Sequence, residues 1–300
     1  MRLKADLTLF FVAVIWGSGF VAQRLAANNH LGAFLFNGGR FLLGALILLP
    51  FALPRWTLKP ADLPWVGLAG VLLFGGGWLQ QAGMQYTSAA NAGFITGLYV
   101  VLVPMLLALF WRQKVRLFSW IAAGLAVFGI WLLSAQGKFR LAPGDGLELL
   151  GSLLWAFHVI LVGRLSRRMD VLPFSVGQFL VGGLLNLCVG ALFELPSLSA
   201  LPLIWPAILY SACFPIALGF TLQVVGQKHA PATDAAILLS MEAVFAALFG
   251  FAWLGEGLST GQVVGCSLML AAMLLAQFNR QPDPGGLAVE TLPASPNTIE

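Results

Sequence analysis

Long apolar segments follow one another along almost the whole chain, interrupted only by short connectors that carry charged, proline or glycine residues. A membrane-spanning helix needs roughly 20 mainly apolar residues, and ten segments meet this requirement. They lie at about 7–25, 31–53, 63–85, 89–111, 117–134, 146–163, 174–194, 202–225, 232–254 and 259–278. Only 9% of the residues are charged, whereas a soluble domain carries about 25% because its surface faces water. The sequence therefore predicts an all-α integral membrane protein with ten transmembrane helices.

Lysine and arginine are unevenly distributed among the connectors. The even-numbered connectors and the two termini hold twelve of them, and the odd-numbered connectors hold three. Positively charged connectors stay preferentially in the cytoplasm, so both termini are expected there. The basic residues form no stripe, so we expect no nucleic acid partner despite the net charge of +4. No organelle-type targeting peptide is recognisable, which favours the inner (plasma) membrane of a prokaryote.

The two halves of the sequence resemble each other. Matches recur at offsets between 138 and 143: residues 40–45 with 178–183, Trp16 with Trp155, and residues 79–83 with 222–226. A repeat of five spans is odd-numbered, so the second copy must be inverted in the membrane. Inverted repeats are typical of alternating-access carriers, which bind substrate near the midplane between the repeats, although channels also contain them.

We accordingly divide the chain into three regions. The first repeat covers residues 1–140 and the second covers 141–278. The remaining segment, 279–300, is rich in proline, glycine and polar residues, so we expect it to be disordered.

Several stretches resemble the EamA-type transporters of the drug/metabolite transporter superfamily. They are residues 16–20 (WGSGF), the pair at 40–41, the stretch 83–104, and 241–245 followed by 254–256. The resemblance covers about 7–278 and implies a ten-helix bundle around a central cavity, which usually exports amino acids or other small metabolites. Family members often have Glu-Pro-Val in the ninth helix. This chain has Ala243 in place of the proline, which leaves the local kink of that helix open.

Two charged residues fall inside predicted spans. Glu242 is near the centre of the ninth span, and Arg40 is about 13 Å into the second at 1.5 Å per residue. A charge at mid-span costs roughly 2.5–3.5 kcal/mol on insertion scales, so each needs a function or a partner. Glu242 is a candidate for proton coupling or for binding a substrate amine, with a structural hydrogen bond as the alternative. Arg40 needs helix-end carbonyls, Glu242 or a substrate carboxylate as its partner.

Other residues within the spans are candidates for a substrate pathway. Aromatic rings can stack on aromatic or cationic substrates, and buried amides can line a wet cavity or link helices. His158 follows Trp155 by one helical turn and shares its face. For the aromatic residues and His158, packing or lipid contact is the more frequent role. This set comprises Trp16, Trp78, Gln81, Asn91, Tyr99, Trp155 and His158.

We therefore predict a secondary transporter that exports a small metabolite, such as an amino acid or an amphipathic amine, by alternating access. Proton antiport through Glu242 and facilitated export are both compatible with the sequence. The expected partners are a small-molecule substrate and the lipid bilayer, and the chain is expected to be a monomer or a homodimer. Neither a cofactor nor a metal site is expected, because the three cysteines show no CxxC spacing.

The rival functions have weaker sequence support. No Walker A motif is present, so this chain alone is not expected to use ATP. An intramembrane enzyme of the rhomboid type requires glycine where Trp16 stands, and no HExxH motif occurs. A channel-like protein is the remaining alternative, but no selectivity-filter sequence or charged ring is visible.

Overall fold

A computed structural model of the chain describes residues 2–115, 117–134, 143–255, 257 and 259–278. Within these ranges every regular element is a helix. The segment at 279–300, predicted to be disordered, lies outside the described residues. So does most of the connector between the two predicted repeats, at 135–142.

Most predicted spans correspond to one continuous α-helix. These helices are α1 (Arg2–Asn28), α2 (Ala33–Ala52), α3 (Leu63–Gly83), α6 (Leu117–Ser134), α7 (Asp145–Leu165), α8 (Val171–Phe193) and α13 (Thr260–Phe278). Three spans are composite: α4 (Ala89–Gly97) with α5 (Tyr99–Trp111); α9 (Leu201–Ser211) with the π-helix η4 (Ala212–Phe220) and α10 (Thr221–Gln227); and α11 (Ala232–Leu239) with α12 (Glu242–Leu254). Short 3-10 turns precede α3 and α9: η1 (Leu53–Arg55), η2 (Pro60–Asp62) and η3 (Leu195–Ala200).

Eight of these helical segments are long and apolar enough to cross a membrane. Two shorter apolar helices, Leu117–Gly129 and Val263–Ala272, lie within α6 and α13. The prediction of an all-helical membrane protein is confirmed for the described residues, with eight rather than ten segments that meet the length and hydropathy requirement.

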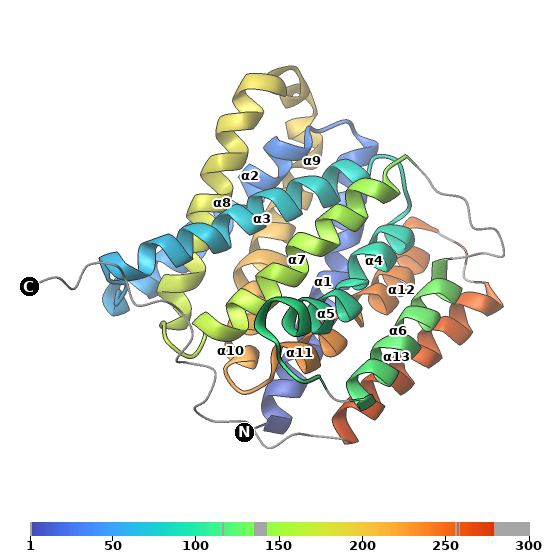
Figure 1. Ribbon diagram of the computed structural model, residues 1–300. Coiled ribbons are helices and arrows are strands. Elements are labelled where there is room, and N and C mark those ends of the chain that lie inside the picture. The colour runs from blue at the N-terminus through green and yellow to red at the C-terminus, as the bar shows by residue number, and fades with distance from the viewer. Residues whose placement is uncertain (1, 116, 135–142, 256, 258, 279–300) are drawn as a thin grey trace, which may run out of the picture.

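The helices form one bundle in which α1 runs through the centre (Figure 1). It contacts α12, α10, η4 and α11. Helix α2 packs along α8, and α3 packs against both α7 and α8. Helices α6 and α13 pack on each other at one edge of the bundle (Figure 1). The centre of the molecule is therefore surrounded by helices from both halves of the sequence.

Glycines allow some of these helices to approach closely. A Cβ atom at Gly17 of α1 would overlap Phe245 and Ala246 of α12, and one at Gly183 of α8 would overlap Leu42 of α2. Helix association in lipid depends on such close van der Waals contact, since lipid tails are as apolar as the helix surfaces. Small residues thus bring helices of the two halves together.

The fourth and ninth spans are both broken at corresponding places. Helix α5 begins at Tyr99 and helix α12 at Glu242, 143 residues later, and each has 13 residues. Each ends at a left-handed residue, Arg112 and Gly255 respectively. The elements of the two spans therefore coincide at an offset of 143.

The break in the ninth span forms without a proline. Short-range bonds run from the N–H of Met241 to the carbonyl of Leu238 and from the N–H of Ala243 to that of Ser240. Such i→i+3 bonds tighten the backbone relative to an α-helix. The ninth span is thus broken although Ala243 stands in place of the proline, because the backbone changes its hydrogen bonding there.

Proline does affect the eighth span. Pro215 lies inside the π-helix η4, and proline removes an N–H donor and displaces the preceding turn. The eighth span therefore contains a π-helical stretch around this mid-span proline. Pro104, by contrast, lies inside the continuous helix α5.

Candidate functional site

A small cavity lies at the centre of the bundle, between helices of both halves. Its volume is about 50 Å³, enough for a few water molecules. Six of the predicted site residues line it: Trp16, Arg40, Tyr99, Trp155, His158 and Glu242.

Glu242 and Tyr99 meet across the cavity at the two helix breaks. The Tyr99 hydroxyl donates a hydrogen bond of 3.0 Å to Glu242 Oε1, and both side chains are buried. Glu242 is the first residue of α12. The break in the ninth span thus places a carboxyl group inside the protein, where α12 begins.

Arg40 is equally buried, with 3% of its surface exposed. Its Nε donates to Asn37 Oδ1 at 2.8 Å, and its guanidinium lies 5.1 Å and 5.3 Å from the ring centroids of Phe36 and Phe41. Among the described residues no carboxylate, Glu242 included, is within ion-pair distance of Arg40. An amide and two aromatic faces stabilise the cation, and its charge is not neutralised.

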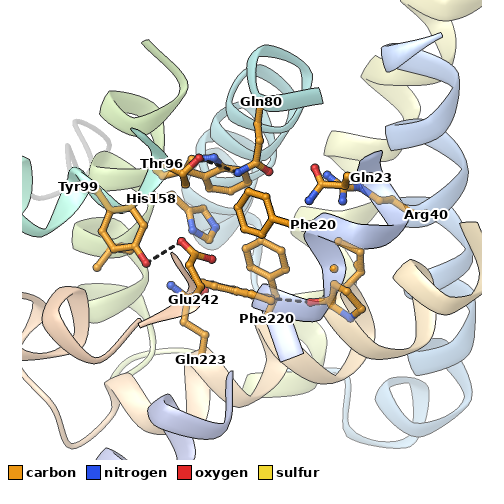
Figure 2. Close-up of a pocket in the computed structure, with 16 residues that line it drawn as sticks. Phe20, Gln23, Arg40, Gln80, Thr96, Tyr99, His158, Phe220, Gln223 and Glu242 are labelled. Atoms are coloured by element: carbon orange, nitrogen blue, oxygen red, sulfur yellow. Dashed lines mark hydrogen bonds between the residues drawn. The ribbon is translucent and has the colours of Figure 1, made fainter. Parts of the chain in front are cut away.

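The two charges occupy opposite sides of the cavity. Figure 2 shows Arg40 and Gln23 on one side and Glu242 with Tyr99 on the other, with the rings of Phe20 and Phe220 between them. One cavity thus contains a buried cation and a buried carboxyl group that do not pair with each other.

Aromatic rings form much of the cavity wall. Phe220 lies 4.7 Å from Trp16, 5.8 Å from Trp155 and 5.6 Å from His158 between ring centroids. The Trp16 indole donates to the carbonyl of Pro215 at 3.0 Å. Phe220 is therefore the centre of an aromatic cluster that joins α1, α7 and η4.

Several polar atoms on the cavity wall have no partner among the described residues. His158 Nε2 is 2.9 Å from Gln178 Oε1, but its Nδ1 is unpaired, as is the indole nitrogen of Trp155. Both side-chain polar atoms of Gln223 are buried and unpaired. Buried polar groups are nearly always hydrogen-bonded, so these atoms indicate space for a polar ligand or for water.

Three predicted site residues are placed differently. Trp78 stacks on Phe34 at 5.1 Å and does not line the cavity. Gln81 donates from Nε2 to the backbone carbonyl of Gln23 at 3.0 Å, which links α3 to α1. The side chain of Asn91 lies outside what the structure describes.

The structure adds residues that sequence reasoning did not select as site residues. Gln23, Gln80, Thr96, Phe220 and Gln223 all line the cavity. For two of them a signal existed, since Gln80 and Gln223 match each other at the offset of 143. Phe220 is one of 23 phenylalanines, and its sequence context does not distinguish it.

Glu148 is a second buried carboxyl group near the cavity. Thr96 Oγ1 donates to Glu148 Oε2 at 3.3 Å and accepts from Gln80 Nε2 at 3.0 Å. Glu148 is fully buried, and its Oε1 has no hydrogen-bond partner among the described residues. The sequence analysis did not select Glu148 as a site residue.

The described residues contain no cluster of three or more histidine, cysteine or acidic side chains that could hold a metal ion. The side chains that line the cavity supply one guanidinium, a carboxyl group, an imidazole, hydroxyls, amides and aromatic faces.

Comparison with known proteins agrees with this architecture. The sequence profile of the EamA-like transporter family matches residues 3–135 and 142–278. An uncharacterized transporter of Archaeoglobus fulgidus is 34% identical over 281 residues, which cover 92% of this chain and 87% of the relative. The threonine/homoserine exporter RhtA of Escherichia coli (strain K12) is 29% identical over 285 residues, or 91% of this chain and 90% of the relative.

A protein of known crystal structure illustrates the fold. It matches with a TM-score of 0.76 at 20% identity, over 93% of this chain and 98% of its own. This likeness concerns the fold alone.

The family profile covers most of the chain, and the names of these relatives are those of transporters. The helical segments long enough to span a membrane agree with that function. The chain belongs to the EamA-like transporter family of the drug/metabolite transporter superfamily, and it is a multi-span membrane transporter.

Proposed function

We propose that this transporter exports a small amino acid and that Arg40 and Glu242 bind its two charged ends. The observation that carries the proposal is the presence of both charges, unpaired with each other, in one buried cavity. A guanidinium binds a carboxylate in a bidentate manner, and the carboxylate of Glu242 is a counter-ion for an ammonium group. The aromatic cluster around Phe220 is suited to the apolar part of the substrate.

The relatives support an amino acid as cargo. RhtA is named an exporter of threonine and homoserine, and both have a carboxylate and an ammonium group on one carbon. A hydroxyl-bearing side chain would also supply a donor and an acceptor for the unpaired amide of Gln223. We therefore expect small hydroxylated amino acids to bind better than aliphatic ones of equal size.

The mechanism we propose is alternating access between two inverted five-span repeats. The spans that begin at 117 and 259 (α6 and α13) complete a set of ten, with repeats at 1–140 and 141–278. The matched family segments, the pair of broken spans at offset 143, and the cavity between helices of both halves support this arrangement. The excess of lysine and arginine in even-numbered connectors supports cytoplasmic termini in a prokaryotic plasma membrane.

Proton antiport is the coupling mode that we favour. Glu242 is the counter-ion for the substrate amine, so a proton and the substrate compete for the same carboxylate. Exchange of one for the other requires no additional site. Tyr99 stabilises the deprotonated carboxylate by donating its hydrogen bond when the substrate has left.

An amphipathic amine is the second candidate substrate. It is favoured by the aromatic rings beside Glu242, which attract cations through their faces. It would use Glu242 and the rings but leave Arg40 without a ligand. The two substrate classes therefore differ in their dependence on Arg40.

Counterflow in proteoliposomes tests the proposal. Vesicles loaded with unlabelled threonine should accumulate labelled threonine with saturable kinetics, as a carrier and not a channel does. Arg40→Gln should weaken this for threonine but not for an amphipathic amine, and Glu242→Gln should weaken it for both. Glu194→Gln is the matched control, because Glu194 binds the backbone N–H of Leu35 outside the cavity. Equal transport by Arg40→Gln and the control would contradict an amino acid substrate.

A further inference from the structure

A second, larger cavity lies on the side of the bundle between α3, α5 and α7. Its volume is about 360 Å³. Its walls are almost entirely apolar and aromatic, and Arg164 is its single charged lining residue. The residues that matter below are Trp65, Leu68, Leu72, Trp111, Phe157 and Arg164.

Arg164 is half-buried, and its guanidinium lies 4.1 Å from the ring centroid of Trp111. Within the described residues it forms no ion pair, and it donates no hydrogen bond. A guanidinium has five N–H donors in a fixed planar fork. Stacking on an indole satisfies one face of the group but none of these donors, so Arg164 lacks an anionic acceptor.

The cavity is lined by residues near the ends of α5 and α7, where basic residues are concentrated. Helix α5 ends at Trp111 and is followed by Arg112 and Lys114. Helix α7 ends just after Arg164 and is followed by Arg167 and Arg168. The cytoplasmic leaflet, where lysine and arginine are enriched, contains the anionic lipids.

We propose that this cavity binds one anionic glycerophospholipid. Its phosphate accepts hydrogen bonds from the Arg164 guanidinium, and one acyl chain lies along Leu68, Leu72 and Phe157. Trp65 and Trp111 lie at the level of the glycerol, where tryptophan is favoured because it has both an apolar ring and a donor. The net charge of the headgroup distinguishes the lipids. A headgroup that contains an ammonium group would be repelled by Arg164 and the neighbouring cations. This inference is independent of the transported substrate.

The bound lipid would join three helices that belong to the transport site. Helix α5 begins at Tyr99, and α7 contains Trp155 and His158. A lipid wedged between the far ends of these helices would restrict how α5 moves against α7. Transport is therefore expected to respond to the anionic lipid content of the membrane.

Native mass spectrometry of the purified protein provides the test. The protein is equilibrated with equal amounts of phosphatidylglycerol and phosphatidylcholine, and the retained lipids are counted. The wild type should retain one phosphatidylglycerol in preference, and Arg164→Gln should weaken that retention by about tenfold, the effect of one charge-assisted contact. Arg55→Gln removes an exposed arginine outside the cavity and should leave retention unchanged.

A second measurement locates the acyl chain. Phosphatidylglycerol brominated on its acyl chain should quench tryptophan fluorescence more than brominated phosphatidylcholine at equal content. This excess should disappear when Trp65 and Trp111 are both changed to phenylalanine. Arg164→Lys, which keeps the charge, should retain the lipid partly, which separates binding from misfolding.

Any of four results would overturn the proposal. Equal retention of the two lipids by the wild type would remove the charge selectivity. Equal retention of phosphatidylglycerol by Arg164→Gln and Arg55→Gln would show that the lipid binds outside this cavity. Displacement of phosphatidylglycerol by inorganic phosphate, or occupation of the cavity by a second copy of the chain, would show that the groove does not hold an acyl chain.

Discussion

The fourth and ninth spans share one backbone design and differ in the chemistry at its centre. Each is broken, and each resumes as a 13-residue helix that ends in a left-handed residue. At the first position of the resumed helix, the fourth span has the phenol of Tyr99 and the ninth has the carboxyl group of Glu242. The scaffold is thus nearly repeated, whereas the groups that would contact a ligand are not.

A similar difference separates Arg40 from its sequence match. At the offset of 138, Arg40 corresponds to Gln178, which contacts His158 and lies beside the cavity rather than on its lining. One half therefore contributes the cation and the other contributes the carboxyl group. A substrate with two unlike ends fits a site whose two halves carry unlike groups, which is the lesson of this comparison.

Glu242→Gln should have the largest effect on transport. The amide cannot be a counter-ion for an ammonium group, and a buried charge-assisted hydrogen bond contributes about 1.5–3 kcal/mol, so we expect transport to fall about 100-fold at the upper end. The stimulation of export by an opposing proton gradient should disappear as well. Uptake of labelled substrate into proteoliposomes at several internal pH values measures both effects.

The phenol provides the matched control for this prediction. Tyr99→Phe removes only one neutral donor, so transport should fall by about fivefold or less, and the pH dependence should remain. If Tyr99→Phe reduced transport as much as Glu242→Gln, the two broken spans would be functionally equivalent. The proposed difference between the phenol and the carboxyl group would then be wrong.

Arg40→Gln should have the second largest effect. The apparent KM for an amino acid should rise between about tenfold and thirtyfold, because a bidentate contact to the substrate carboxylate is lost. The apparent KM for the corresponding amine, which lacks the carboxylate, should change little. Competition between the two compounds in counterflow measures this change in preference. If the apparent KM rose equally for both compounds, Arg40 would have a structural role and would not bind the substrate carboxylate.

Glu148→Gln should have a smaller effect, about threefold to fivefold on the transport rate. Glutamine still accepts the hydrogen bond of Thr96, and Glu148 does not line the cavity, so substrate affinity should be preserved. A change confined to the pH dependence of the rate would indicate that Glu148 of α7 takes part in proton transfer. An altered KM would instead place Glu148 in contact with the substrate.

Ala243→Pro should have the smallest effect. Ala243 is the second residue of α12, where the fixed φ of proline fits the first turn of a helix, and the substitution removes one hydrogen bond, from the Ala243 N–H to the Ser240 carbonyl. The free energy of unfolding should therefore change by no more than about 1 kcal/mol. Ala246→Pro, one turn further into the helix, should cost about 3 kcal/mol or more. Thermal unfolding in detergent compares the two, and equal destabilisation would show that the break does not accommodate proline.

Much of the membrane architecture followed from local chemistry. Apolar runs bounded by charges predicted the helices, because the bilayer requires internally bonded, apolar segments. Charges are so costly in such segments that Arg40 and Glu242 could be selected without any structure. The structure places both on the wall of one cavity.

Which faces of the helices meet was decided only by the tertiary structure. In a membrane, the lipid-facing and protein-facing sides of a helix are both apolar, so the sequence pattern does not distinguish Trp16, which lines the cavity, from Trp78, which does not. Phe220 and Gln223 reach the cavity because η4 and α10 pack against α1. Glu148 is buried because Thr96 and Gly83 cover it. The cost of burying a charge is a property of a single residue and can be read from the sequence. Which side chains meet at the cavity depends on the packing of helices that are distant in the chain.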